Sequence, residues 1–283
     1  MEMGVNCSFP VLKGGISLEI RRIKRGLDGF SLKLIALILM TIDHVGYFFA
    51  SFGAPVWLRW IGRLAAPVFL FLLAEGFAHT KSREKYLLRM YLAGVGMAAM
   101  SLVLNRSFIR ADGMILRCNI FFSLFWVLLL LTVFTRVRAC FREGKRAFAC
   151  AILFAAAGFF LLARLLRVLP VSAFWTEAAN VLLPDLFSVE GGAEFVFTGV
   201  LLYVLRQYPL LQAGAYVLLC VYRMPFGCGA EAFFLTDYGW MAMASVVLWL
   251  LYDGRRGFSA KLLFYGYYPI HIGVLFVLPC LIG

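Results

Sequence analysis

Residues 31–53, SLKLIALILMTIDHVGYFFASFG, form a long apolar run that contains an aspartate and a histidine side by side. About 20 apolar residues are enough for a helix to cross the roughly 30 Å hydrocarbon layer of a membrane. Hydrophobic residues make up 63% of the 283-residue chain and charged residues only 15%, which leaves too little polar surface for a soluble protein. The sequence therefore predicts an all-α fold, a polytopic bundle of transmembrane helices.

Further apolar stretches follow this run along the chain, and short basic clusters separate them. A helix satisfies its own backbone hydrogen bonds and can therefore cross lipid. We expect about nine spans, at residues 31–53, 57–79, 86–105, 119–135, 147–165, 192–206, 210–223, 237–252 and 261–282.

Residues 1–30 lack the continuous apolar core of a cleaved signal peptide, so we expect them to remain as a basic cytoplasmic segment before one transmembrane domain at 31–283. With this end inside, most of the 27 lysines and arginines fall on the inner side, as the positive-inside rule requires. The rule also accounts for the net charge of +12. Because no nucleic-acid-binding motif accompanies that charge, membrane lipids and not nucleic acid are the expected partners.

The seven cysteines show no C-x-x-C spacing and do not cluster with the three histidines, so no metal site is expected. A glycine-rich phosphate loop and a G-x-S-x-G nucleophile elbow are also missing from the sequence. The ionisable residues inside the expected spans are therefore the candidates for function.

Two histidines come from opposite ends of the chain to a similar expected depth. At about 1.5 Å per residue, Asp43 and His44 lie roughly 18 Å from the start of the first span. By the same measure His271 lies about 15 Å into the last span. A charge at such a depth costs about 2.5–3.5 kcal/mol on insertion scales, so it normally faces a protein interior or an aqueous cavity and has a partner.

Arg63 overlaps Asp43 in depth and is the expected counter-ion of that carboxylate. Pro67 follows four residues later and removes the N–H that would bond the Arg63 carbonyl, so a kink is expected there. A structural interpretation makes Asp43 and Arg63 an ion pair between helices, with His44 and His271 as polar contacts. A functional interpretation places the same residues around a cavity, which is the default for ionisable groups inside a membrane.

Three stretches of the chain resemble the TraX family of bacterial membrane proteins: GFSLKLIALILMTIDHVGYFF, LRWIGRLAAPVFLFLLAEGFAHTKSREKYLLRMYL and LYDGRRGFSAKLLFYGYYPIHIGVLFVL. Between about residues 105 and 235 the resemblance is limited to FTGVLLYVL. The motif positions carried over are Asp43, His44, Gly62, Arg63, Pro67, Glu75, His79, Tyr268 and His271.

The resemblance implies an acetyltransferase of the bacterial inner membrane that uses acetyl-CoA, since conjugative-pilus TraX acetylates the N-terminus of pilin. His44 or His271 would be the general base, and Asp43 would orient that base or hold Arg63. Arg63 or Tyr268 would donate to the developing oxyanion. The acceptor would be an amine or hydroxyl of an exported peptide, a glycan or a lipid-linked molecule.

The expected cofactor site is the basic segment after the second span, where Lys81 and Arg83 would bind phosphates of acetyl-CoA, with His79 and Tyr268 as further contacts. Two simpler interpretations stay open: the positive-inside rule explains the lysine and arginine, and His79 fits an interfacial residue at a helix end. The alternative function is a proton-coupled or anion-coupled transporter or flippase.

Overall fold

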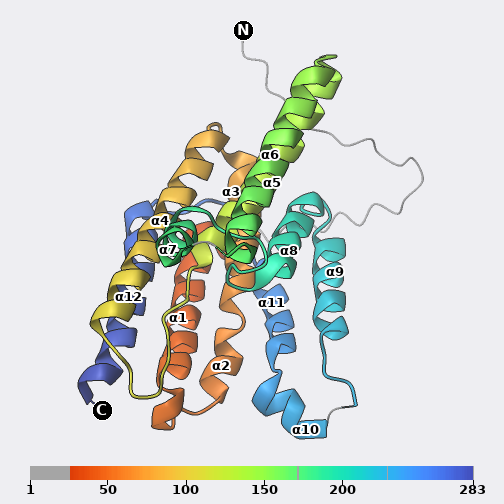
Figure 1. Ribbon diagram of the computed structural model, residues 1–283. Coiled ribbons are helices and arrows are strands. Elements are labelled where there is room, and N and C mark those ends of the chain that lie inside the picture. Colours follow the sequence, from red (N-terminus) through yellow and green to blue (C-terminus); the bar gives the residue numbers. More distant parts are fainter. Residues whose placement is uncertain (1–25, 171, 228, 283) are drawn as a thin grey trace.

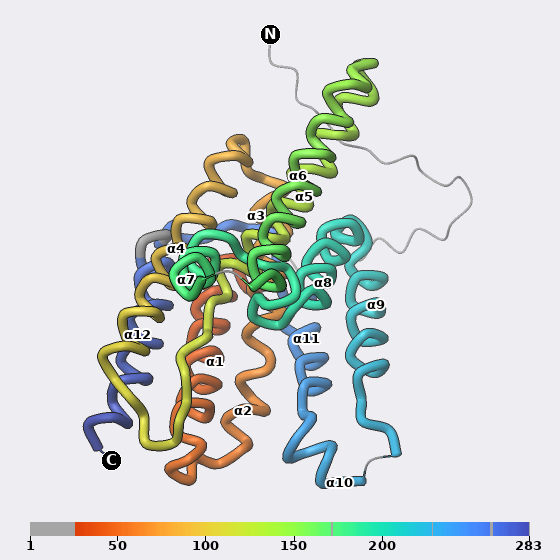
Figure 2. The backbone as a smooth tube through the Cα atoms, in the orientation of Figure 1, coloured from red at the N-terminus to blue at the C-terminus, as the bar shows by residue number. Residues whose placement is uncertain are grey.

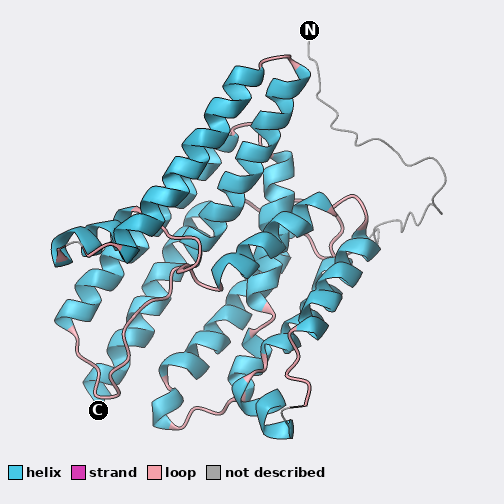
Figure 3. Ribbon diagram, turned by 45° about the vertical axis from the view of Figure 1, so that its right-hand side comes forward, coloured by secondary structure: helices cyan, strands magenta, loops and turns pink. Residues whose placement is uncertain are grey.

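The computed structural model describes residues 26–170, 172–227 and 229–282, and in these ranges the chain is helical and contains no strand (Figures 1 and 3). The expected all-α bundle is therefore confirmed. Nearly all of the basic segment expected at residues 1–30 lies outside the described residues. The helices longer than 12 residues are α1 (Gly29–Phe48), α3 (Ala65–His79), α4 (Arg83–Ser107), α5 (Ile120–Arg142), α6 (Arg146–Val168), α8 (Gly192–Val204), α9 (Pro209–Tyr222) and α12 (Lys261–Ile282).

Shorter helices join these elements. They are η1 (Ala50–Phe52), α2 (Trp57–Gly62), α7 (Ala173–Leu182), α10 (Gly229–Glu231), the π-helix η2 (Ala232–Thr236), the 3₁₀-helix η3 (Gly239–Ala244) and α11 (Ser245–Leu250). The hairpin of α5 and α6, drawn in green, extends beyond the other helices in Figure 1.

The expected count of about nine membrane spans is not confirmed. Among the described residues, six helical segments are long and apolar enough to cross a membrane, and a seventh results if the segments 229–236 and 239–250, which meet at 60°, count as one. The expected spans at 192–206 and 210–223 correspond to α8 and α9, which have 13 and 14 residues. At 1.5 Å per residue each is only about 20 Å long, shorter than the hydrocarbon layer. Apolar composition alone does not distinguish such short helices from spans.

The helix is interrupted near Arg63, where a kink was expected. Helix α2 ends at Gly62 and α3 begins at Ala65, so Arg63 and Leu64 form a turn within one apolar segment. Pro67 lies in the first turn of α3, where a missing N–H costs no helical hydrogen bond.

Five helices pack together in the core. Each of them contributes at least one side chain that has no exposed surface. These residues are Leu32 of α1, Val68 of α3, Val127 of α5, Leu202 of α8 and Ile272 of α12. Helices α1 and α12 lie side by side although they stand at opposite ends of the described chain (Figure 2). The core therefore brings together the two spans that carry His44 and His271.

Backbone hydrogen bonds also join the start of α1 to the loop before α12. The N–H of Leu27 donates to the carbonyl of Leu251 at 2.8 Å, and the carbonyl of Leu27 accepts from Asp253 at 3.1 Å. The N–H of Gly29 donates to the carbonyl of Arg255 at 2.8 Å. These bonds fix the ends of the two helices relative to each other.

Helices α1 and α2 approach most closely at Gly62. A Cβ atom added to Gly62 would lie 2.2 Å from Cβ of Asp43, far inside van der Waals contact. On the other helix, a Cβ added to Gly46 would lie 2.9 Å from Cβ of Leu58. Small residues of this kind let helix backbones pack closely in membranes.

We expect Gly62→Ala to destabilise the folded protein by about 1–3 kcal/mol, because α2 must move away from Asp43 to accommodate the methyl group. Gly96→Ala is the matched control, since Gly96 lies in α4 and has open space around its Cβ position. Thermal unfolding of both variants in detergent checks the prediction. Equal stability of the two variants would show that the close approach is not needed.

Candidate functional site

The structure brings His44 and His271 into direct contact. Nδ1 of His44 lies 2.8 Å from Nε2 of His271, and both side chains are buried. Nδ1 of His271 lies 2.8 Å from the backbone carbonyl oxygen of Tyr267, one turn earlier in α12. The two histidines expected at similar depth are therefore one hydrogen-bonded pair.

The partners of this pair determine where its protons lie when both rings are neutral. A carbonyl oxygen only accepts, so Nδ1 of His271 carries a proton and its Nε2 does not. Nδ1 of His44 must then donate to Nε2 of His271, and Nε2 of His44 is left without a proton. That nitrogen has no hydrogen-bond partner in the described part of the chain. It is the atom of the pair that can accept a proton.

Asp43 pairs with two arginines, of which the sequence analysis identified one. Arg63 donates from Nη2 to both carboxylate oxygens, at 2.7 and 2.6 Å, and from Nε to Oδ1 at 3.2 Å. Arg59 donates from Nη1 to Oδ2 at 2.5 Å and to the backbone carbonyl of Asp43 at 2.9 Å. The guanidinium of Arg59 also lies over the ring of Tyr47, 5.0 Å from its centre.

The spacing of the two arginines could have revealed the second one. Arg59 and Arg63 are four residues apart, which places them on one face of a helix. The Asp43 side chain is 10% exposed, against 16% for Arg59 and 31% for Arg63. The arginines thus enclose the carboxylate and keep part of their own surface accessible.

Tyr268 connects the histidine pair to Glu190, a residue that the sequence analysis missed. The Tyr268 hydroxyl accepts from the N–H of Ile120 at 3.2 Å and donates to Oε2 of Glu190 at 3.1 Å. Its ring centre lies 6.1 Å from that of His44 and 5.6 Å from that of His271. Burial raises the pKa of Glu190. Glu190 lies in the loop between α7 and α8, where the sequence offered little resemblance and no motif.

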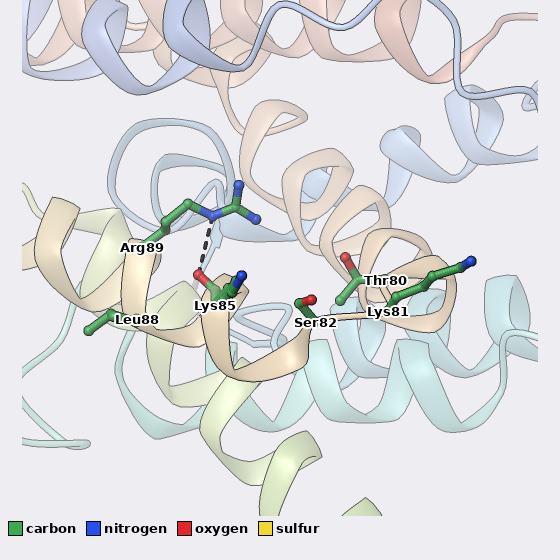
Figure 4. Close-up of a pocket in the computed structure, with 6 residues that line it drawn as sticks. All are labelled: Thr80, Lys81, Ser82, Lys85, Leu88 and Arg89. Carbon is green, nitrogen blue, oxygen red and sulfur yellow. Dashed lines mark hydrogen bonds between the residues drawn. The ribbon is translucent and has the colours of Figure 1, made fainter.

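The basic segment expected to bind phosphates borders an open cleft of about 510 Å³ at the junction of α3 and α4 (Figure 4). Its lining residues are Thr80, Lys81, Ser82, Lys85, Leu88 and Arg89. Arg83 is absent from this lining, and its guanidinium lies over the ring of Phe77 at 4.8 Å.

The cleft and the histidine pair do not form one site. His79 stands 16 positions after Arg63 in a nearly continuous helical segment, which at 1.5 Å per residue corresponds to about 24 Å. His79 is exposed at the far end of α3. Its Nε2 lies 3.7 Å from Oε2 of Glu75, four residues earlier in the helix. Of the residues expected to contact the cofactor, only Tyr268 therefore lies beside the histidines.

The chemistry of the central site is that of a proton acceptor next to positive charge. Over the residues that the structure covers, no group of three or more His, Cys, Asp or Glu side chains is arranged to hold a metal ion. The chain is all-α and has several helices of membrane-spanning length, and three of these segments carry paired ionisable groups. These features define a polytopic membrane protein with a buried polar centre.

The chain belongs to the TraX protein family, whose model matches residues 29–279. This match includes the middle region, where the resemblance by motifs was weak. The chain is also similar to a probable fimbrial assembly protein, FimC of serogroup H1, from Dichelobacter nodosus. The two are 30% identical over 205 residues, which is 58% of this chain and 84% of the relative. No solved structure matches the chain.

Proposed function

We propose that this TraX-family protein is an acyltransferase of the bacterial inner membrane, which transfers acetyl from acetyl-CoA to an amine or hydroxyl of an exported or envelope acceptor. The observation that carries the proposal is the hydrogen bond between Nδ1 of His44 and Nε2 of His271, which orients the His44 ring and leaves its Nε2 available to accept a proton. The name of the fimbrial relative supports an acceptor in fimbrial assembly, such as an exported peptide. A glycan or a lipid-linked molecule is chemically equivalent as an acceptor.

His44 is the general base in this proposal. Its Nε2 accepts the proton of the acceptor N–H or O–H while the acceptor attacks the thioester carbonyl. The resulting imidazolium returns the proton to the departing thiolate, so His44 ends the cycle in its starting form. His271 keeps Nδ1 of His44 engaged throughout and so maintains the ring orientation.

Positive charge near the base would stabilise the oxyanion that develops on the carbonyl. Of the two donors expected from the sequence, Tyr268 already donates its proton to Glu190. Nη1 of Arg63 makes no hydrogen bond to another described residue, while Asp43 holds the other edge of the guanidinium. We therefore assign the donor role to Arg63 and the role of holding it to Asp43.

The donor molecule supplies an activated acetyl thioester when it is bound. Lys81, Lys85 and Arg89, with the hydroxyls of Thr80 and Ser82, suit the phosphate groups of that donor, because cations and hydroxyl donors line one cleft. This cleft lies about one length of α3 away from Arg63. Mutations could therefore affect phosphate binding and proton transfer separately.

A transporter or flippase is the second candidate. The break between α2 and α3 lies beside the Asp43 ion pairs, and discontinuous helices of this kind line the binding sites of secondary transporters. A transporter would move an anion or proton across a sealed vesicle without consuming acetyl-CoA.

Acetyl-CoA turnover by the purified protein tests the proposal. Release of free thiol in detergent should depend on an amine or hydroxyl acceptor, and labelled acetyl should appear on that acceptor. Transport of an anion into proteoliposomes with no thiol release would favour the second candidate and overturn the first.

The proposed orientation places the N-terminus in the cytoplasm, since the basic clusters would then lie inside. Topology reporters inserted after Gly144 and after Gly254, which stand next to Lys145 and Arg255, should both report the cytoplasmic side. A reporter inserted after Gly113, in the loop between α4 and α5, should report the opposite side. Detection of the first two reporters on different sides would contradict this orientation.

A further inference from the structure

The ion-pair cluster at Asp43 has more positive than negative charge. One carboxylate faces two guanidiniums, and an arginine stays protonated at any physiological pH. Glu190 is a further carboxylate that interacts electrostatically with Asp43 and Arg63, but it forms no ion pair with either arginine. Its hydrogen-bond partner is Tyr268. Burial raises the pKa of Glu190, which favours the neutral carboxyl group. About one positive charge at the cluster therefore has no counter-ion among the residues that the structure describes.

Each of the two arginines also has a hydrogen-bond donor that no described residue uses. Arg59 uses Nη1 for Asp43, and its Nε lies 3.4 Å from the Tyr238 hydroxyl, so Nη2 is free of partners in the described ranges. Arg63 uses Nε and Nη2, which leaves Nη1. Both side chains keep accessible surface, 16% and 31%, whereas the carboxylate between them is mostly covered.

A partly exposed guanidinium inside a membrane-spanning segment cannot face hydrocarbon at low cost. The accessible edges of Arg59 and Arg63 must therefore face water or a bound anion. Tyr238 of the bent segment limits this space, since the guanidinium of Arg63 lies 5.9 Å from the centre of its ring.

We propose that Arg59 and Arg63 form a binding site for a phosphodiester group, with Tyr238 at its border. A phosphodiester carries a single negative charge, which matches the single uncompensated positive charge of the cluster. Its oxygens can accept from both guanidiniums at once, the geometry for which arginine is suited. Such a group occurs in phospholipid headgroups and in soluble molecules. This site goes beyond the proposed acyl transfer, because the charge excess exists whichever reaction the histidines support. Nη1 of Arg63 would contact either the phosphodiester or the oxyanion, whereas Nη2 of Arg59 is available to the phosphodiester in both cases.

Binding of a short-chain lipid to the full chain in neutral detergent tests this site without any acyl transfer. Dioctanoyl phosphatidylglycerol should raise the temperature of thermal unfolding in a saturable way, whereas dioctanoylglycerol, which lacks the phosphate, should not. Glycerophosphoglycerol and coenzyme A are the soluble arms. A shift with lipid alone identifies a headgroup as the ligand. An equal shift with either soluble compound identifies a soluble phosphodiester or pyrophosphate only if Arg59→Lys reduces it, because coenzyme A can also bind at the Lys81 cleft.

Arg59→Lys should weaken binding of the probe by about 10-fold or more, because lysine keeps the charge beside Asp43 but loses the second amino group. Arg63→Lys serves as a second variant if the first does not fold. Arg223→Lys is the matched control, since Arg223 pairs with Glu194 at the surface.

The site would be ruled out if the wild type showed no phosphate-dependent shift, if acetate alone reproduced that shift, or if both lysine variants bound like the wild type. Acetyl transfer is measured separately. A protein that binds the probe but transfers no acetyl group would refute the proposed function and leave the phosphodiester site intact.

Discussion

His44→Ala is expected to lower acetyl transfer by about 10²–10⁴-fold, while the yield of folded protein stays close to that of the wild type. The loss follows from the proton positions of the pair, because only Nε2 of His44 is free to accept a proton. His271→Ala should cost less, about 10–100-fold, since it removes the group that orients the base and leaves the base itself. His271→Gln should recover part of that loss, because its amide oxygen can accept from Nδ1 of His44.

Labelled acetyl-CoA and an acceptor, supplied to membranes that contain each variant, give the measurement. Wild-type activity should fall when the pH is low enough to protonate the histidine pair, because only a neutral imidazole accepts a proton. A greater loss from His271→Ala than from His44→Ala would reverse the assignment. Two stable and fully active alanine variants would refute the histidine mechanism.

Asp43→Asn is expected to destabilise the folded protein by about 3–5 kcal/mol, because it leaves two partly buried guanidiniums without their shared carboxylate. Arg63→Met should cost less, since Arg59 still neutralises Asp43. This asymmetry is specific to one carboxylate that forms ion pairs with two arginines. A simple one-to-one pair would give similar losses from either side.

A double-mutant cycle on unfolding in detergent checks this second prediction. Asp43→Asn combined with Arg63→Met should be more stable than the sum of the two single losses predicts, because the double variant removes one unpaired charge. Arg106→Met is a suitable control, since Arg106 forms an exposed ion pair with Glu177 on the surface. Strict additivity would show that Asp43 and Arg63 do not interact energetically.

The amino-acid sequence was sufficient to predict the helical class and much of the central site. Apolar runs predicted the helices, and depth along the first and last spans placed His44 and His271 at similar heights, where the structure brings them into contact. The same reasoning paired Asp43 with Arg63 and explained the break before Pro67. These features depend on distance along a helix, which sequence spacing measures directly.

Other parts of the site depend on contacts between distant segments. Glu190 reaches Tyr268 from a loop 78 residues earlier, and no local pattern indicates such a contact. The cleft at Lys81 was expected to serve the histidines, but α3 separates the two by most of its length. The count of about nine spans is not confirmed, because α8 and α9 are apolar in composition but short.

Because the histidine pair joins α1 to α12, it can form only after α12 has been synthesised. His44 and His271 are 227 residues apart, so translation at about 5–20 residues per second separates their synthesis by roughly 10–50 s. During that interval the imidazole of His44 lacks its partner from α12. The histidine pair forms only when α12 inserts beside α1 and the loop before it bonds to Leu27 and Gly29. A nascent chain that stops before α12 therefore has every residue of the arginine cluster but no oriented base.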